Sequence, residues 1–542
     1  MLTTLAAPAF AKTWHIEDGD ITVKAGTTGN DVTQNNKTTY GDKDTVITNQ
    51  NKDIASSNTV TIDAGNDKVE VTLDNVNIKT DSGSALTSKG DVTLTLKGDN
   101  SFTGGISGNS SYDLSGISSS GSLTISGGET DSLTAQGGSG ENGGDGIFSF
   151  GRVAISGGTV NATGGVGSSR NGGSGIYSSN SSVTISGGTV NAAGGNGNFS
   201  GGCGIYNSGS LIISDGTVNA TGGNGKDGYG GYGISSSDVA ISGGTVNANG
   251  GDSKDGYGGN GISSSSGVAI SDGTVNANGG DSKNGSGGSG IFSFDRVAAI
   301  SGGTVNANGG NGGSGDGGDG IRSFAPVAIS GGAVTANGGS GNSSGGNGIY
   351  SRNDIDLSGS LELTAKAGSP NGKALSQRGN ELDLNTIKDK LGPGAKVTAT
   401  DADGKVIDQV PIPRPVEPEG PVIPEESSSS SDGGSAAPSA PAFSFPGLTV
   451  TDKDGQRISY TSTQSGNTLT VCVGRLTASF RISLAALRQL RAEGIETITF
   501  QTVLCSTTLS LDELLAMGGE DAEVVLTHHI RSSTLTVGGK AV

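Results

Sequence analysis

Aromatic side chains recur at one place in a repeated sequence. Each copy contains Gly-Ile, and the residue after the isoleucine is often aromatic. An aromatic face binds the apolar face of a sugar ring, and tyrosine adds a hydroxyl for hydrogen bonding. The glycine-rich segments between copies could instead cover these rings, and the sequence leaves both interpretations open. The aromatic members of the column are Phe148, Tyr177, Tyr206, Phe292 and Tyr350, and Ser235, Ser263 and Arg322 interrupt it.

Asparagine forms a second column with the same period. It lies between valine and alanine in the motif Val-Asn-Ala, on the side of the strand that faces outward. Stacked amides could present donors and acceptors to a polysaccharide every 4.8 Å or so, the spacing of neighbouring strands. They could also hydrogen-bond to one another, which needs no ligand and is the favoured interpretation. The column consists of Asn161, Asn191, Asn219, Asn247, Asn276 and Asn306.

Aspartates in the glycine-rich segments suggest a weak calcium site, because calcium binds carboxylate and carbonyl oxygens. Residues 222–230 fit the glycine- and aspartate-rich nonapeptide of calcium-binding β-rolls. In such a roll each turn supplies half of the ligands, whereas the next match here lies a full repeat away. Solvated loop aspartates are therefore the simpler explanation, and no other cofactor is expected. The candidate ligands are Asp227, Asp252 and Asp255.

The repeats contain few of the residue combinations that enzymes need for catalysis. The three histidines, His15, His528 and His529, all lie outside them, so neither a histidine-based triad nor a zinc site is expected there. No position of the repeat supplies the carboxylate cluster and nearby base of a lyase, or the opposed carboxylates of a glycosidase. We expect a protein without catalytic activity.

An internal repeat must position these columns. The motif Ile-Ser-Gly/Asp-Gly-x-Val-Asn-Ala recurs every 28 to 30 residues, and Gly-Ile precedes each copy. Each unit holds three short segments of alternating apolar and polar residues bounded by glycine, which is typical of strands. One coil cannot bury its inward residues alone, so the coils must stack. The sequence predicts an all-β, right-handed parallel β-helix over residues 12–400. Strong and weak copies begin at Ile125, Ile155, Ile185, Ile213, Ile241, Ile270, Ile300, Ile329 and Leu357.

Composition excludes several classes of protein. The chain has 542 residues, 100 of them glycine, and a formal net charge of −19. That charge argues against a nucleic-acid partner, because phosphate-binding surfaces need clustered lysine and arginine. The sequence holds no apolar run long enough to cross a bilayer, so membrane insertion is not expected. The chain is expected to be a monomer.

The two ends of the sequence differ from the repeats. Residues 1–11 end in Ala-Phe-Ala and read as the remnant of a signal peptide, so we expect an extracellular protein, secreted or held at the cell surface. Residues 401–446 are rich in proline and serine and are predicted to be a linker. Residues 447–542 are predicted to form a small α+β domain, with helices over 482–490 and 509–515. Its Cys472 and Cys505 could form a disulfide in an oxidising compartment or remain buried thiols.

The strings ISGGTVNATGG and GGSGIYSS resemble the glycine-rich repeats of β-helix proteins secreted by anaerobic Gram-positive gut bacteria, commonly named carbohydrate-binding-domain-containing proteins. The resemblance covers roughly residues 12–400, including the opening WHIEDGDITVKAG. A related clostridial β-helix domain binds calcium and acidic plant polysaccharide, so the resemblance implies glycan binding. In this chain GIYSS and GIFSF stand where the relatives carry GIGGG.

Three functions follow as hypotheses. The first is a non-catalytic protein that binds polysaccharide, or a host or cell-surface glycan, or mediates adhesion through side-chain ladders. The second is a structural spacer that displays the C-terminal domain. The third is a polysaccharide lyase-like enzyme, which analogy of fold alone suggests.

Overall fold

The computed structural model describes residues 12–106, 114–179 and 181–411, and residues 448–541 except 453–456, 459, 466, 474–476, 493, 503–505, 518–521 and 529–532. The chain forms two compact units, divided after Ile412. The predicted signal-peptide remnant and residues 412–446 of the predicted linker lie outside the described residues.

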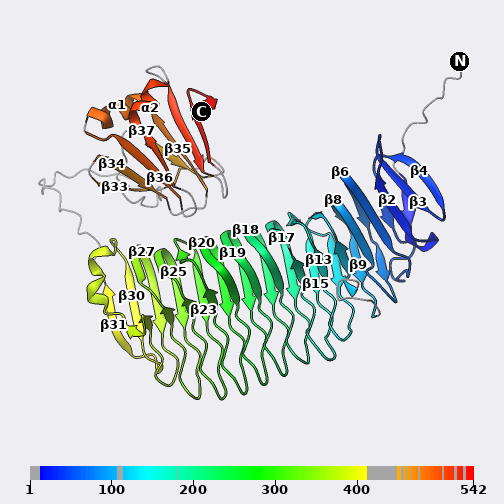
Figure 1. Ribbon diagram of the computed structural model, residues 1–542, viewed down its shortest axis with the longest axis horizontal. Helices are drawn as coiled ribbons and strands as arrows, with labels where there is room; N and C mark the ends of the chain where they lie inside the picture. Colours follow the sequence, from blue (N-terminus) through cyan, green and yellow to red (C-terminus); the bar gives the residue numbers. More distant parts are fainter. Residues whose placement is uncertain are drawn as a thin grey trace, which may run out of the picture. The chain divides into compact units, whose positions relative to one another are not determined.

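The first unit is a parallel β-helix, as the sequence predicts (Figure 1). Equivalent residues of successive coils pair in parallel and in register. Ile176 pairs with Ile147 in the preceding coil and with Ile205 in the following one. This pairing carries every side-chain column straight along the axis of the helix.

The core of this unit is built from the inward isoleucine, valine and alanine of each segment. These side chains are almost completely buried, and they form one continuous cluster from Trp14 to Val410. Because the apolar residues alternate with outward polar residues, each coil buries one side of its strands and exposes the other. Stacking of the coils therefore supplies the core.

Glycine is required at two places in each coil. At the turn between the second and third segments, Gly244 has φ of 74°, a left-handed conformation that side chains disfavour. In the glycine-rich inserts, a Cβ on Gly251 would lie 2.0 Å from the carbonyl oxygen of Gly223 in the preceding coil. The inserts are thus closely stacked layers of backbone, which form the lower edge of the β-helix in Figure 1.

Antiparallel strands close both ends of the β-helix. The first end carries β2 (Ile21–Ala25), β3 (Asn30–Gln34) and β4 (Lys37–Asp42), and β3 pairs antiparallel with both of the others. At the other end β31 (Val406–Pro411) pairs antiparallel with β30 (Lys396–Thr400). The β-helix therefore continues beyond the predicted end at residue 400, because the segment predicted as the start of the linker adds a strand to the last coil.

Elements of the N-terminal half are less regular than the later coils. They are β1 (Thr13–His15), η1 (Ile16–Asp18), β2 (Ile21–Ala25), β3 (Asn30–Gln34), β4 (Lys37–Asp42), β5 (Val46–Thr48), β6 (Val60–Asp74), β7 (Asn77–Lys79), β8 (Leu86–Lys97), β9 (Asp99–Thr103), β10 (Ile117–Ser119), β11 (Ser122–Ser126) and β12 (Ser132–Gln136).

The glycine-rich coils and the C-terminal end follow. Their elements are β13 (Ile147–Ser149), β14 (Val153–Ile155), β15 (Thr159–Thr163), β16 (Ile176–Ser178), β17 (Val183–Ala193), β18 (Ile205–Thr221), β19 (Ile234–Asn249), β20 (Ile262–Asn278), β21 (Ile291–Ser293), β22 (Ala298–Ile300), β23 (Thr304–Asn308), β24 (Ile321–Ser323), β25 (Val327–Asn337), β26 (Ile349–Ser351), β27 (Ile355–Lys366), β28 (Leu375–Gln377), β29 (Asn380–Glu381), η3 (Leu384–Thr386), η4 (Lys388–Lys390), β30 (Lys396–Thr400) and β31 (Val406–Pro411).

The second unit is a small domain with two sheets and two helices. One sheet has the order β32-β35-β38-β39-β40 and the other β33-β34-β36-β37. The helices begin two residues later than predicted, after Ser483 and Ser510, whose hydroxyls accept backbone N–H bonds and cap them. The elements are β32 (Leu448–Thr451), β33 (Thr461–Ser465), β34 (Thr468–Cys472), β35 (Ala478–Ser483), α1 (Leu484–Ala492), β36 (Thr497–Gln501), β37 (Ser506–Ser510), α2 (Leu511–Ala516), β38 (Glu523–His528), β39 (Ser533–Val537) and β40 (Lys540–Ala541).

The predicted disulfide of this domain stays a prediction. Cys472 is half-buried, with its Sγ 3.5 Å from Oε1 of Gln501. Cys505 lies outside the described residues.

Candidate binding site

The asparagine column is a closed hydrogen-bonded ladder. Asn191 donates from Nδ2 to Oδ1 of Asn161 at 2.8 Å, and Asn219 donates to Asn191 at 2.8 Å. The pattern continues at the same distance through Asn247, Asn276 and Asn306. The amides thus pair with one another, which is the interpretation that the sequence favoured. Each internal member donates one N–H to the preceding amide and accepts one from the next.

A second amide ladder runs beside the first and was not predicted. Asn278 donates to Asn249 at 2.8 Å, Asn308 to Asn278 at 2.7 Å, and Asn337 to Asn308 at 2.7 Å. The signal in the sequence was the triplet Asn-Ala-Asn, which places a second amide on the same outward face two residues later.

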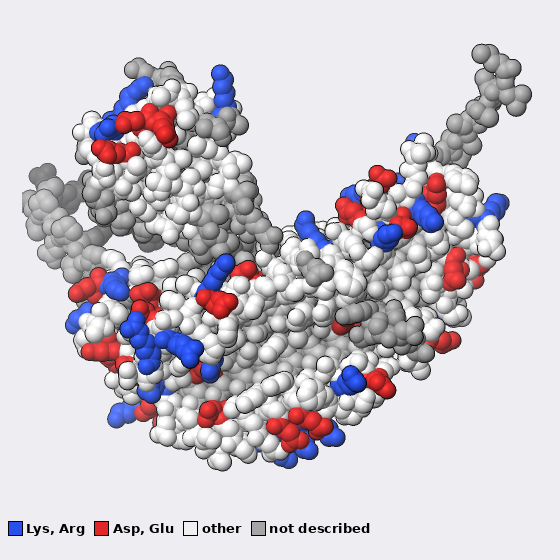
Figure 2. Space-filling model, in the orientation of Figure 1, with Lys and Arg blue, Asp and Glu red and all other residues white. Residues whose placement is uncertain are grey.

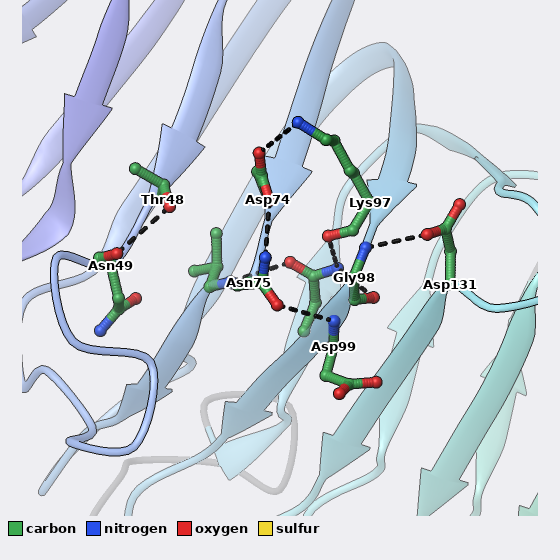
Figure 3. A network of polar contacts seen from close by, with 10 residues as sticks. Thr48, Asn49, Asp74, Asn75, Lys97, Gly98, Asp99 and Asp131 are labelled. Atoms are coloured by element: carbon green, nitrogen blue, oxygen red, sulfur yellow. Dashed lines mark hydrogen bonds and ion pairs between the residues drawn. The ribbon is translucent and has the colours of Figure 1, made fainter.

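In the less regular coils, charged groups take over this linking role (Figure 3). Nζ of Lys97 lies 2.8 Å from Oδ2 of Asp74, and Asn75 donates to the other oxygen of that carboxylate. The backbone N–H of Gly98 donates to Asp131 in the next coil at 2.8 Å. The contacts of Lys97 and Gly98 bind successive coils to each other, so these groups are engaged in the structure rather than free to hold a ligand.

The aromatic column is a stack of rings along the axis. The centroids of Phe148 and Tyr177 are 5.4 Å apart with an interplanar angle of 29°. Tyr177 and Tyr206 are 4.7 Å apart at 18°. Phe148 is buried, whereas Tyr177, Tyr206, Phe292 and Tyr350 are half-buried. One ring of the predicted column is therefore buried, in edge contact with Phe150, and the others are partly accessible.

Two serines open a cavity in this stack. Tyr206 pairs in register with Ser235, Ser235 with Ser263, and Ser263 with Phe292. A cavity of about 270 Å³ lies over the two serines, between the rings of Tyr206 and Phe292. We call it the serine slot. Its lining consists of Tyr206, Asn207, Ser208, Ser235, Ser236, Ser237, Ser263, Ser264, Ser265, Phe292 and Phe294.

The serines of the slot are of two kinds. Ser236 and Ser264 point inward and are buried, and their hydroxyls donate to backbone carbonyls, as in the 2.8 Å bond from Ser236 to Asp238. Ser235 and Ser263 point outward, and their hydroxyls have no hydrogen-bond partner within the described part of the chain. The floor of the slot therefore presents two hydroxyls that are available to a ligand.

A phenylalanine lines one side of the slot, and an arginine of the same coil lies outside its lining. Arg296 extends past Gly267 toward Asp238, with 3.9 Å between Nη1 and Oδ1. Phe294 is 47% exposed and stands at the turn where the first segment of its coil ends. The ring thus borders the slot without being part of the core.

Tyr350 does not extend the stack of rings to the slot. The guanidinium of Arg322 lies 5.2 Å from the ring centroids of both Tyr350 and Phe324. Arg322 also contacts the buried carboxylate of Asp319 at 3.2 Å. Burial raises the pKa of Asp319, and the charge of Arg322 opposes that rise. This end of the column is therefore a cation–π cluster rather than an open platform.

The predicted calcium ligands lie along the insert edge, where Figure 2 shows acidic and basic side chains together. Oδ1 of Asp252 accepts the backbone N–H of Asp281 at 2.8 Å. Asp255 accepts a bond of 2.6 Å from Asn284, which together with nearby Lys254 lowers its pKa. Among the described residues, no three carboxylate, histidine or cysteine side chains gather as a metal site would need. The structure does not bring Asp227 into such a group with the other two.

A buried carboxyl lies just before one of the Gly-Ile pairs. Oδ1 of Asp145 accepts the backbone N–H of Ser174 at 2.6 Å, and the residue is 5% exposed. Burial raises the pKa of Asp145 to about 7, and the bond from Ser174 opposes part of the rise. Asn260 and Asn347 occupy equivalent positions and accept the same kind of bond with a neutral amide.

The comparisons with known proteins agree with this architecture. Residues 153–176, 183–205, 211–238, 239–266 and 268–290 match the family described as Beta helix repeat. The chain is a parallel β-helix protein. No curated protein and no solved structure gives a significant match. Such repeats occur in enzymes and in non-catalytic proteins, so the match speaks for the fold of this β-helix and not for an activity.

Ser235 and Ser263, the floor of the slot, lie within the matched segments, and Tyr206 follows directly after one of them, so the slot is built on β-helix repeat coils. No helix among the residues described here is long and apolar enough to span a membrane.

Proposed function

We propose that this β-helix protein binds glycans without catalysis and that the serine slot holds their sugar rings. The observation that carries the proposal is the pair of missing rings in the aromatic stack. Where Ser235 and Ser263 stand, a ligand can take the place of two side-chain rings, between Tyr206 and Phe292.

The chemistry of the slot favours sugar over a purely aromatic ligand. A sugar ring offers apolar C–H groups to the face of Tyr206 and hydroxyls at its edge to the floor. A hydrocarbon ring would fill the same space but would cover the hydroxyls of Ser235 and Ser263 without bonding to them. Covering an unpaired hydroxyl costs about 1–3 kcal/mol.

The expected affinity of one slot is low. Ring stacking contributes about 0.5–1.5 kcal/mol and each floor hydrogen bond about 1 kcal/mol. Three such contacts with modest burial of apolar area correspond to a Kd of about 1 mM. A polysaccharide surface that engages many copies of the protein would raise the apparent affinity through multivalency.

The location of the protein is part of the same proposal. We infer that the protein is exported and meets polysaccharide, or a host or cell-surface glycan, outside the cell. The Ala-Phe-Ala sequence at residues 9–11 supports export. Detection of the protein in the culture medium or in a cell-surface fraction would test this part separately.

Retention of the full chain on a panel of immobilised plant, microbial and animal glycans tests the binding. We expect retention on at least one glycan, unchanged by chelator, since the slot needs no metal. Tyr206→Ala should weaken retention about threefold to tenfold through loss of the stacking face. Tyr257→Ala is the matched control, because this tyrosine is 54% exposed and lies outside the slot.

Two outcomes would overturn the proposal. One is a folded protein that no glycan of the panel retains, in which case the spacer function becomes the better account. The other is equal retention of the wild type and Tyr206→Ala.

A further inference from the structure

We infer that the serine slot receives the end of a glycan chain and not its interior. The inference rests on the proposed function and adds the class of ligand. It follows from the direction in which the rings of the stack face and from the sides on which the slot is closed.

The orientation of Tyr206 fixes the orientation of the ligand. One face of its ring stacks on Tyr177, with the centroids 4.7 Å apart and the planes at 18°. Its other face therefore looks along the axis toward the coil of Ser235, into the slot. A sugar ring stacked on that face stands with its plane across the axis and enters the slot edge-first.

The walls prevent a chain from running along the axis. Tyr206 and Phe292 are three coils apart, a separation of about 14 Å. They close the slot at both axial ends, since both line the cavity. A chain that followed the axis at the depth of the floor would meet one of these rings, so the polymer leaves the slot in another direction.

The turn closes a third side. Ser208, Ser237, Ser265 and Phe294 come two residues after the ring positions, at the turn where the register between coils shifts, and they line the same cavity. A ring that enters edge-first has one edge on the floor and the neighbouring edge against this turn. An interior sugar carries two linkages, commonly at opposite edges of the ring, and one of them would meet the floor or the turn. A terminal sugar has only one linkage, which can point to solvent.

Chain length distinguishes the two modes of binding. The measurement is competition by a soluble form of the retained glycan, either intact or cut into fragments about ten times shorter. At equal mass, the fragments carry about ten times more ends and should inhibit retention about tenfold better if ends are bound. Equal or weaker inhibition by the fragments at equal mass would overturn end binding.

A second variant tests end binding independently. Phe294→Ala removes a wall at the turn end, so interior sugars should gain access and the advantage of fragments over intact polymer should shrink. An unchanged advantage in this variant would also count against the inference. Failure of the proposed function looks different, because retention would then be absent or indifferent to Tyr206→Ala.

Discussion

The asparagine column and the aromatic column follow the same repeat, yet they have opposite capacities for binding. Along the asparagine column, Asn191, Asn219 and their neighbours each donate one N–H to the preceding amide and accept one from the next. Along the aromatic column, Ser235 and Ser263 leave two hydroxyls and the face of Tyr206 without a partner in the described coils. In an unbroken column the side chains bond or stack with one another, and a ligand site arises where the residue type in the column changes.

The largest expected effect on stability concerns the position before Gly-Ile, where a carboxyl group replaces a neutral amide. Asp145 occupies a position where other coils have Asn260 and Asn347, and its pKa is raised to about 7 by burial. The unfolded chain loses this proton near pH 4 and the folded protein near pH 7. The free energy of unfolding should therefore fall as the pH rises from 4 to 7 and then level off, by about 4 kcal/mol in total.

Asp145→Asn should remove this fall and stabilise the protein at neutral pH. The comparison is the thermal midpoint of both proteins between pH 4 and pH 8, with hydrogen exchange near Ser174 to locate the opening. Parallel pH profiles for the wild type and the variant would show that the charge of Asp145 carries no such cost.

A smaller effect is expected from breaking the closed ladder. Asn219→Leu removes the bond to Asn191 and the bond from Asn247, each 2.8 Å long. At about 1 kcal/mol for each bond, the free energy of unfolding should drop by about 2 kcal/mol. Urea denaturation measures the change. Glycan retention should stay as in the wild type, and a loss of retention without a loss of stability would make the ladder itself a binding surface.

The smallest effect on free energy comes from completing the broken column. Ser263→Phe adds a ring beside Phe292 and occupies half of the slot. Retention on glycan should weaken at least tenfold, or about 1.4 kcal/mol, while stability is maintained. Ser314→Phe, on an exposed insert, is the control. Unaltered binding by Ser263→Phe would move the site away from the slot.

Much of the fold could be predicted from the sequence, because the period is written directly in it. Ile-Ser-Gly-Gly and Gly-Ile keep one spacing, so the coil, its inward residues and its outward columns follow from alternation alone. The end of the β-helix was harder to predict from the sequence. The strand that ends at Pro411 depends on pairing with Lys396–Thr400, which local composition does not reveal.

The slot could not be predicted, although its walls were among the predicted residues. In the sequence Ser235 and Ser263 only interrupt a column of aromatic residues. The register of the coils shows that this interruption leaves a cavity between two rings. Whether an amide is free or paired likewise depends on rotamers. Thus the sequence favoured pairing of Asn161 with its neighbours over ligand binding, and the Nδ2–Oδ1 distances show the pairing.

The register of the coils has a consequence for how this protein can change over generations. The width of the slot equals the number of coils with serine at the ring position, at about 4.8 Å for each coil. Deletion or duplication of one repeat, such as residues 234–261, by unequal recombination would leave the stacking of the other coils intact. One such event would narrow or widen the slot by a single ring. The length of the slot along the axis can therefore change only in steps of one coil, and the size of ligand that fits changes with it.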